Sequence, residues 1–88
     1  MKRNPHFELM DVAGEFMAIP VGKEAATFGG IVALNEEAFF LLNQFSEPMS
    51  IDALIDVLVN EYDVDESTAR EDINMFIQKM VGFGIIEM

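Results

Sequence analysis

The chain has no cysteine and few basic residues. The absence of cysteine from its 88 residues excludes thiolate metal sites, thiol catalysis and a disulfide-stabilised scaffold. Only five Lys and Arg stand against sixteen Asp and Glu, which gives a net charge of −11. Because proteins gain affinity for nucleic acids by neutralising phosphates with basic side chains, we expect no nucleic-acid partner. Anionic membrane surfaces are disfavoured for the same reason, and a basic or apolar partner is the natural complement.

Long apolar runs are also missing. No stretch approaches the ~20 apolar residues of a membrane span, and Glu8 and Asp11 interrupt any secretory signal. We therefore expect a cytoplasmic protein with no membrane partner. The composition is 51% hydrophobic with eight Phe, so a core can form, and the length predicts a single domain over residues 1–88. Residues 1–5 are expected to be disordered.

The sequence offers no reactive constellation. His6 is the only histidine, and we interpret it as a solvated residue near a terminus. A calcium loop beginning at Asp63 lacks two required residues, since Thr68 stands at the glycine position and Asn74 at the glutamate position. The carboxylates lie on predicted solvated helix faces, so no acid–base pair is indicated. We expect no catalytic residue, no metal, no cofactor and no enzymatic activity.

Three apolar segments predict strands. Residues 7–12 and 16–21 are separated by a short turn that contains Gly14, which indicates a β-hairpin. Pro20 cannot donate to a ladder and is expected at a strand end or edge. Residues 21–24 then predict a turn or wing tip. The third strand is predicted over residues 28–34.

The third predicted strand is apolar or small on both alternating faces. A strand of a thin sheet usually shows one polar face. An uncovered apolar edge would favour aggregation. Either this edge accepts an added peptide strand, or the chain termini or a dimer mate cover it.

Three helices follow the strands. Their predicted N-caps, each followed by an apolar periodic segment, are Asn35, Ser50 and Asp65. The first has an inner stripe of Ala38, Leu41, Leu42 and Phe45 and ends at residues 46–48. The second covers residues 51–62, and Gly82 or Gly84 ends the third. Ile85 and Ile86 then add a short strand or pack on the core. The class is α+β, winged helix-turn-helix-like: a three-stranded antiparallel sheet followed by three helices (β-β-β-α-α-α).

The third helix has an apolar stripe and a second, partly apolar flank. The stripe consists of Ala69, Ile73, Phe76, Ile77 and Met80. The second flank carries Asp72, Met75, Lys79 and Phe83. In a winged helix-turn-helix the last helix normally enters DNA. Here the helix has only two basic residues, Arg70 and Lys79, and more acidic residues than basic ones. This charge balance is unfavourable for contacts with phosphates.

Four short patterns resemble one protein family. They are Gly29-Gly30-Ile31-Val32-Ala33-Leu34-Asn35, Leu58-x-x-x-Tyr62, Asp72-Ile73-x-x-Phe76-Ile77 and Gly84-Ile85-Ile86. In this order and spacing, over residues 6–87, the chain resembles protein D of pyrroloquinoline quinone (PQQ) biosynthesis (PqqD-like) and the recognition elements for ribosomally made, modified peptides. It departs from the usual pattern at Glu36-Glu37-Ala38, where the family tends to have a small or hydroxyl residue and then Gly or Ala.

The resemblance implies a non-catalytic adaptor. In relatives, the leader of a precursor peptide adds to the edge of the third strand, against the third helix, and is presented to a modifying enzyme, often a radical S-adenosylmethionine (radical SAM) enzyme. Carried over, the strand wall would be Ile31, Val32, Ala33 and Leu34. The helix wall would draw on Asp72, Met75, Phe76 and Lys79, with Phe83 as a further candidate.

Two alternatives remain open at this point. One is a winged-helix DNA-binding regulator, which requires a basic face on the third helix. The other is a structural subunit that dimerises through the third-strand edge. The sequence is compatible with a monomer or a homodimer.

Overall fold

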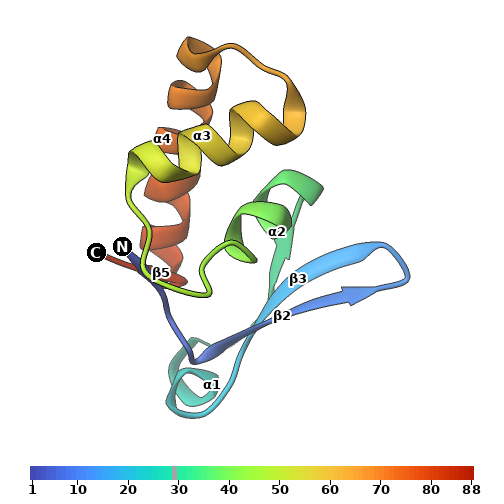
Figure 1. Ribbon diagram of the computed structural model, residues 1–88. Coiled ribbons are helices and arrows are strands. Elements are labelled where there is room, and N and C mark those ends of the chain that lie inside the picture. Colours follow the sequence, from blue (N-terminus) through green and yellow to red (C-terminus); the bar gives the residue numbers. More distant parts are fainter. Residues whose placement is uncertain (29) are drawn as a thin grey trace.

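A three-stranded antiparallel sheet forms one side of the molecule. The computed structural model describes residues 1–28 and 30–88, and in it the strands β2 (Phe7–Val12), β3 (Glu15–Pro20) and β4 (Val32–Leu34) lie in the order β2-β3-β4. Ala13 and Gly14 both have positive φ, at 54° and 85°, as a tight two-residue hairpin turn requires. The hairpin projects from the body (Figure 1), and Pro20 ends β3 as predicted.

Three helices pack on and beyond the sheet. They are α2 (Glu36–Leu42), α3 (Ile51–Tyr62) and α4 (Glu66–Phe83). Each begins where the sequence predicts, because the capping side chain accepts a hydrogen bond from the backbone N–H three residues later. These bonds run from Ala38 to Asn35, from Ala53 to Ser50 and from Thr68 to Asp65. The expected sheet followed by three helices is confirmed.

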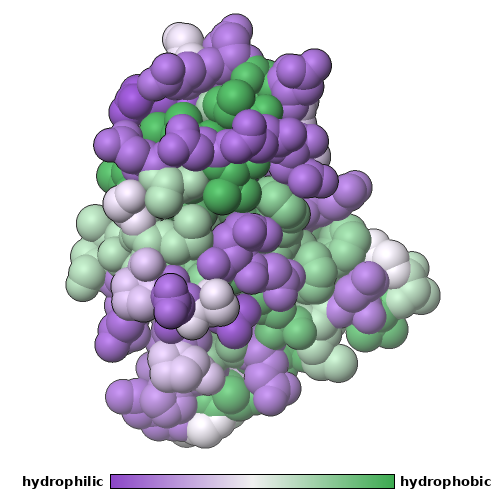
Figure 2. Space-filling model, viewed as in Figure 1, coloured by the Kyte–Doolittle hydropathy of each residue, from purple (hydrophilic) through white to green (hydrophobic). Residues whose placement is uncertain are grey.

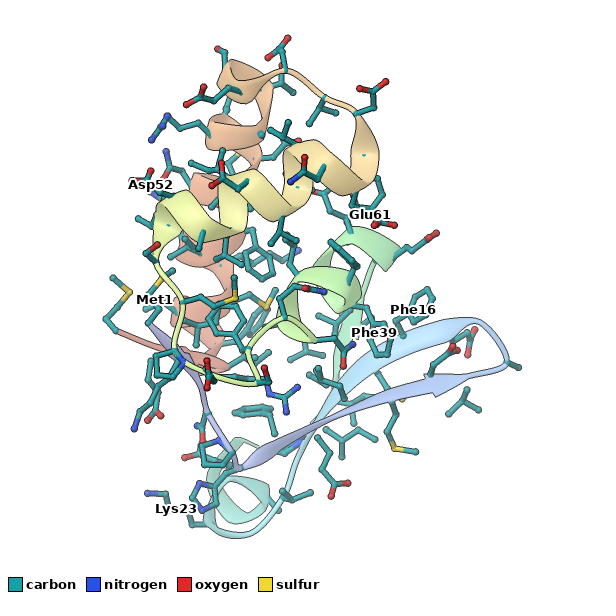
Figure 3. All side chains as sticks on the ribbon, in the orientation of Figure 1. Met1, Phe16, Lys23, Phe39, Asp52 and Glu61 are labelled. Carbon is teal, nitrogen blue, oxygen red and sulfur yellow. The ribbon has the colours of Figure 1, made fainter. Side chains whose placement is uncertain are left out.

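The hydrophobic core joins the two halves. Helix α2 packs on β3 and β4, and α3 packs along α4. Phe16 of β3 and Phe39 of α2 lie together, with ring centroids 4.6 Å apart (Figure 3). The fully buried side chains of the core include Phe7, Leu41, Leu42, Leu54, Leu58, Ile73, Ile85 and Ile86. Figure 2 shows hydrophilic residues over much of the helical end of this face and hydrophobic residues towards the centre and the hairpin.

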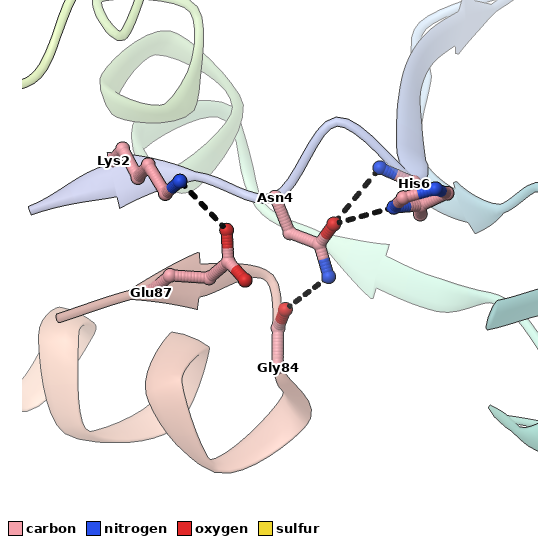
Figure 4. A network of polar contacts seen from close by, with 5 residues as sticks. All are labelled: Lys2, Asn4, His6, Gly84 and Glu87. Carbon is pink, nitrogen blue, oxygen red and sulfur yellow. Dashed lines mark hydrogen bonds and ion pairs between the residues drawn. The ribbon is translucent and has the colours of Figure 1, made fainter. Parts of the chain in front are cut away.

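The chain ends are ordered by mutual contacts, which contradicts the expected disorder of residues 1–5. Strand β1 (Lys2–Arg3) pairs antiparallel with β5 (Ile86–Glu87). Next to it, buried Asn4 donates from Nδ2 to the Gly84 carbonyl (3.0 Å) and accepts at Oδ1 from the His6 backbone N–H (2.9 Å) (Figure 4). His6 is therefore part of a polar network and is half-buried, not solvated.

The segment before β4 differs from the expectation. Residues 21–24 were expected as a turn and 28–34 as a strand, but helix α1 covers Lys23–Phe28 and the strand is confined to Val32–Leu34. Residue 29 lies outside the described residues. The physical reason is local: Lys23, Glu24 and Ala25 are good helix formers, and the positive φ of Gly22, 60°, turns the chain into the helix.

The sequence did not define the C-terminal ends of helices α2 and α4, and the structure does. Helix α2 ends at Leu42, before the predicted end at residues 46–48. After Leu42 the backbone N–H groups of Gln44 and Phe45 donate to the carbonyls three residues back, and the side-chain amides of Asn43 and Gln44 donate to the last carbonyls of the helix. Phe45 is still buried. Helix α4 ends at Gly84, which is left-handed with φ 81°, so Gly84 and not Gly82 is its terminator. Among the described residues, no helix combines the length and apolar character needed to cross a membrane.

Substitution of the two glycines by alanine should have opposite effects. Gly84→Ala places a side chain at positive φ and should lower the free energy of unfolding by about 1–2 kcal/mol. Gly82 lies inside α4 with open space around its Cα, so Gly82→Ala should raise it by about 0.5–1 kcal/mol. Urea unfolding of both variants measures this, and equal effects at the two positions would contradict the assignment of the helix end.

Candidate functional site

The hydrogen-bond pattern of the hairpin fixes the direction of the β3 backbone groups. Val21 N–H donates to the His6 carbonyl (2.7 Å), and this bond continues the β2–β3 register in which Phe7 opposes Pro20. In an antiparallel ladder, consecutive residues direct their backbone groups alternately to the two sides. Counting from Val21, the backbone groups of Phe16 and Ala18 therefore point away from β2 and towards β4.

The same alternation leaves Ala33 facing outwards. Leu34 and Val32 oppose Phe16 and Ala18 in the β3–β4 register, so they form the hydrogen-bonded pairs. Ala33 lies between them and directs its N–H and C=O to the other side of β4. Among the described residues no strand pairs with that side. The sheet edge therefore offers one donor and one acceptor at a single exposed residue.

A groove lies between this edge and α4. Its volume is about 270 Å³. The end of β4 forms one wall, α4 forms the other, and α2 contributes between them. The lining residues are Ala33, Leu34, Asn35, Glu37, Ala38, Leu41, Asp72, Met75, Phe76, Lys79 and Met80. Apolar side chains thus lie beside an open backbone edge, an arrangement suited to an added peptide strand.

Two carboxylates lie close together at one end of the groove. Burial raises the pKa of Glu37 above its ordinary value of 4.5, and the negative charge of Asp72 raises this pKa further. Both side chains are half-buried. Glu37 also contributes, after burial and Glu36, to the raised pKa of Tyr62 at the end of α3. This end of the groove is therefore electronegative and favours a positive charge.

Six of the eight site residues expected from the sequence line the groove: Ala33, Leu34, Asp72, Met75, Phe76 and Lys79. The other two do not line it. Val32 points into the core at 6% exposure, and Ile31 precedes the strand and is 61% exposed. Phe83, the further candidate, is also outside the lining. Whether these residues bind a peptide stays a prediction.

Sequence reasoning missed the contribution of α2. Ala38 and Leu41 were predicted only as part of the inner stripe of the first helix, and Glu37 was noted only as a departure from the family pattern. All three line the groove. The departure from the family pattern at residues 36–38 was the available signal, because Asn35 already supplies the capping side chain of α2 and the two acids after it are not needed for that role. Within the part of the chain that the structure describes, no group of three His, Cys, Asp or Glu could hold a metal ion.

The raised pKa of Glu37 predicts a specific pH dependence. Because the folded state binds this proton more tightly than the unfolded state, ionised Glu37 destabilises the fold, and its cost disappears as pH falls through the raised pKa towards 4.5. Glu37→Gln should therefore raise the free energy of unfolding at pH 7 by at most about 1 kcal/mol, since the group is partly exposed. This gain should shrink towards pH 4.5.

Chemical denaturation from pH 4 to pH 8 measures the difference between variant and parent. Glu8→Gln, which removes one charge from the exposed surface of β2, controls for net charge. A gain from Glu37→Gln that is constant with pH would contradict the assignment.

Comparisons with known proteins identify the fold and the family. Two solved structures share the fold: "TbiB1 in Complex with the TbiA(beta) Leader Peptide", with TM-score 0.79, 17% identity and coverage of 99% of this chain and 95% of that chain, and "Lasso peptide synthetase B1 complexed with the leader peptide", with TM-score 0.74, 17% identity and coverage of 96% and 93%. A search of curated protein sequences finds no match. The model of the family described as Coenzyme PQQ synthesis protein D (PqqD) matches residues 9–86, and because this match spans most of the chain, the protein belongs to that family.

Proposed function

We propose that this protein is a non-catalytic adaptor that binds the leader of a ribosomally made precursor peptide and presents it to a modifying enzyme of the radical SAM type. The leader adds as a strand to the open side of β4. The observation that carries the proposal is the outward-facing backbone of Ala33 beside the groove between β4 and α4. Such an edge supplies backbone affinity, and the adjacent side chains supply selectivity.

The comparisons support this reading. Both solved structures that share the fold are complexes with a leader peptide, and the family takes its name from the synthesis of coenzyme PQQ. The proposed peptide-binding residues are Ile31, Val32, Ala33, Leu34, Asp72, Met75, Phe76 and Lys79. Glu37 and Leu41 of α2 join them, because they line the same groove.

The division of labour within β4 follows from its register. Val32 and Leu34 anchor the strand, since their side chains are buried and their backbones pair with β3. Ala33 has the remaining backbone groups for an incoming residue. Ile31, exposed just before the strand, is placed to contact the same peptide as it leaves the groove. Met75, 64% exposed on α4, contributes flexible apolar surface of the kind used in peptide binding.

A DNA-binding function has less support. Of the two basic residues on α4, Arg70 is engaged by Glu66 at 3.2 Å and by Asp52 at 3.7 Å. The remaining one, Lys79, faces the groove. The whole chain has a net charge of −11, and α4 lacks the cations that phosphate binding requires.

Substitution of Ala33 by proline tests strand addition. Proline removes the N–H that faces the open side and leaves the β3 ladder untouched, so an edge position tolerates it. The preceding residue, Val32, is already extended, as a residue before proline prefers. Ala33→Pro should weaken binding of the synthetic leader of the precursor peptide encoded nearest the gene by about tenfold, which is the contribution of about one backbone hydrogen bond.

Calorimetry measures the affinity, and amide chemical shifts locate the contact. Ala33→Val, which keeps the N–H, is the matched control and should bind nearly as the parent does. Shift changes should concentrate in β4, α2 and α4. Full binding by Ala33→Pro, or a dimer in light scattering that persists with leader in excess, would contradict strand addition at this edge.

A further inference from the structure

The groove has opposite charges at its two ends. Asp72 and Lys79 line it from the same helix, seven residues apart, which corresponds to about 10.5 Å along a helix axis. Met75 and Phe76 lie between them on the same helical stripe. The α4 wall therefore runs from an acid through apolar surface to a base.

The acidic end is reinforced by a second carboxylate from another element. Glu37 of α2 lies close enough to Asp72 for the Asp72 charge to act on it. Among the ion pairs of the described residues, none involves Glu37, Asp72 or Lys79. Two carboxylates at one end and one ammonium group at the other are thus available to a ligand.

The direction of the groove follows from the chain trace. Figure 1 shows β4 rising towards α2, and α4 descending from its loop with α3 to β5. The two walls therefore run in opposite directions. The carboxylates lie where β4 ends and α2 begins, and Lys79 lies towards the other end. A strand added antiparallel to β4, the slightly more stable mode, starts at the acidic end.

Strand geometry then sets the spacing. Side chains of an added strand alternate between the groove and the opposite face of the sheet, and each residue advances about 3.3 Å. Groove-facing residues two positions apart are separated by about 6.6 Å, and those four apart by about 13 Å. The charged ends are about 10.5 Å apart along α4, so side chains about 6.6 Å apart fall short of one end. Side chains about 13 Å apart reach both ends, because Lys and Glu can bend inwards. The residue between them faces the apolar middle.

On the basis of the function proposed above, we propose that the groove selects leaders by charge order. The recognised segment reads, from its N-terminus, basic–x–apolar–x–acidic. The basic side chain pairs with Glu37 and Asp72, the apolar side chain packs on Met75 and Phe76, and the acidic side chain pairs with Lys79. The raised pKa of Glu37 agrees with this assignment, because an incoming cation relieves the repulsion between the two carboxylates.

Two peptides of identical composition test the order. The first, Gly-Thr-Lys-Thr-Leu-Thr-Glu-Thr-Gly, has the proposed order, and the second exchanges its Lys and Glu. Both carry neutral termini and the same fluorescent label. Fluorescence anisotropy with the full chain should show at least about fivefold tighter binding of the Lys-first peptide at low salt, because two partly exposed ion pairs are exchanged for two repulsive contacts. The preference should decline as salt is added.

Variants assign the preference to the groove. The neutral double variant Glu37→Gln with Asp72→Asn should abolish most of it, and Lys79→Gln should reduce it. The control variant Glu8→Gln with Glu47→Gln also removes two negative charges, but from exposed positions that do not line the groove. It should leave the preference intact. Thermal unfolding of each variant verifies that it folds.

The outcomes separate this proposal from the proposed function. Equal binding of both peptides, or tighter binding of the Glu-first peptide, overturns the charge order; if Ala33→Pro still weakens both, strand addition stands. A preference that survives in the neutral double variant overturns the role of Glu37 and Asp72. No binding of either peptide up to millimolar concentration overturns the charge order, whereas strand addition is decided by the binding of the synthetic leader to the parent and to Ala33→Pro.

Discussion

The side of β4 that faces away from β3 has no partner strand among the described residues, and the rest of the site depends on this constraint. The strand is only three residues long because Asn35 caps α2 immediately after it. The capped helix turns back over the sheet and packs on β3 and β4. As a result, α2 lines the groove beside the edge instead of covering the edge itself. A longer strand would displace this helix, and the groove would lose Glu37 and Leu41.

Helix α4 serves both the core and the groove. Ala69, Ile73 and Ile77 are buried in the core, and Asp72, Met75 and Lys79 of the second stripe line the groove. The buried Phe76 and Met80 belong to both. Because the two stripes share one rigid helix, the core packing also fixes the positions of Asp72 and Lys79. Two of the acidic residues that make the chain negative, Glu37 and Asp72, lie together at one end of the groove. That end therefore carries a net negative charge.

The sequence predicted those parts of the fold that depend on local interactions. The caps at Asn35, Ser50 and Asp65 and the hairpin turn at Gly14 are short-range signals, and the structure has all of them. It did not predict helix α1, where good helix formers were outweighed by the apolar run that follows. The β1–β5 pairing and the position of α2 beside the groove depend on contacts between residues distant in sequence, so no local pattern could indicate them. The resemblance supplied six of the residues that line the groove, whereas the outward direction of the Ala33 backbone groups follows only from the strand register.

The pairing of β1 with β5 makes the backbone almost a closed ring. Lys2 and Glu87 are direct partners in that ladder and also form an ion pair at 3.9 Å, so the two ends lie about 5 Å apart at the Cα atoms. A short linker could therefore join them, and new ends could be opened at the exposed Ala13–Gly14 turn. Such a circular permutant would keep β4, α2 and α4 in unbroken sequence, so we expect it to keep the groove between them.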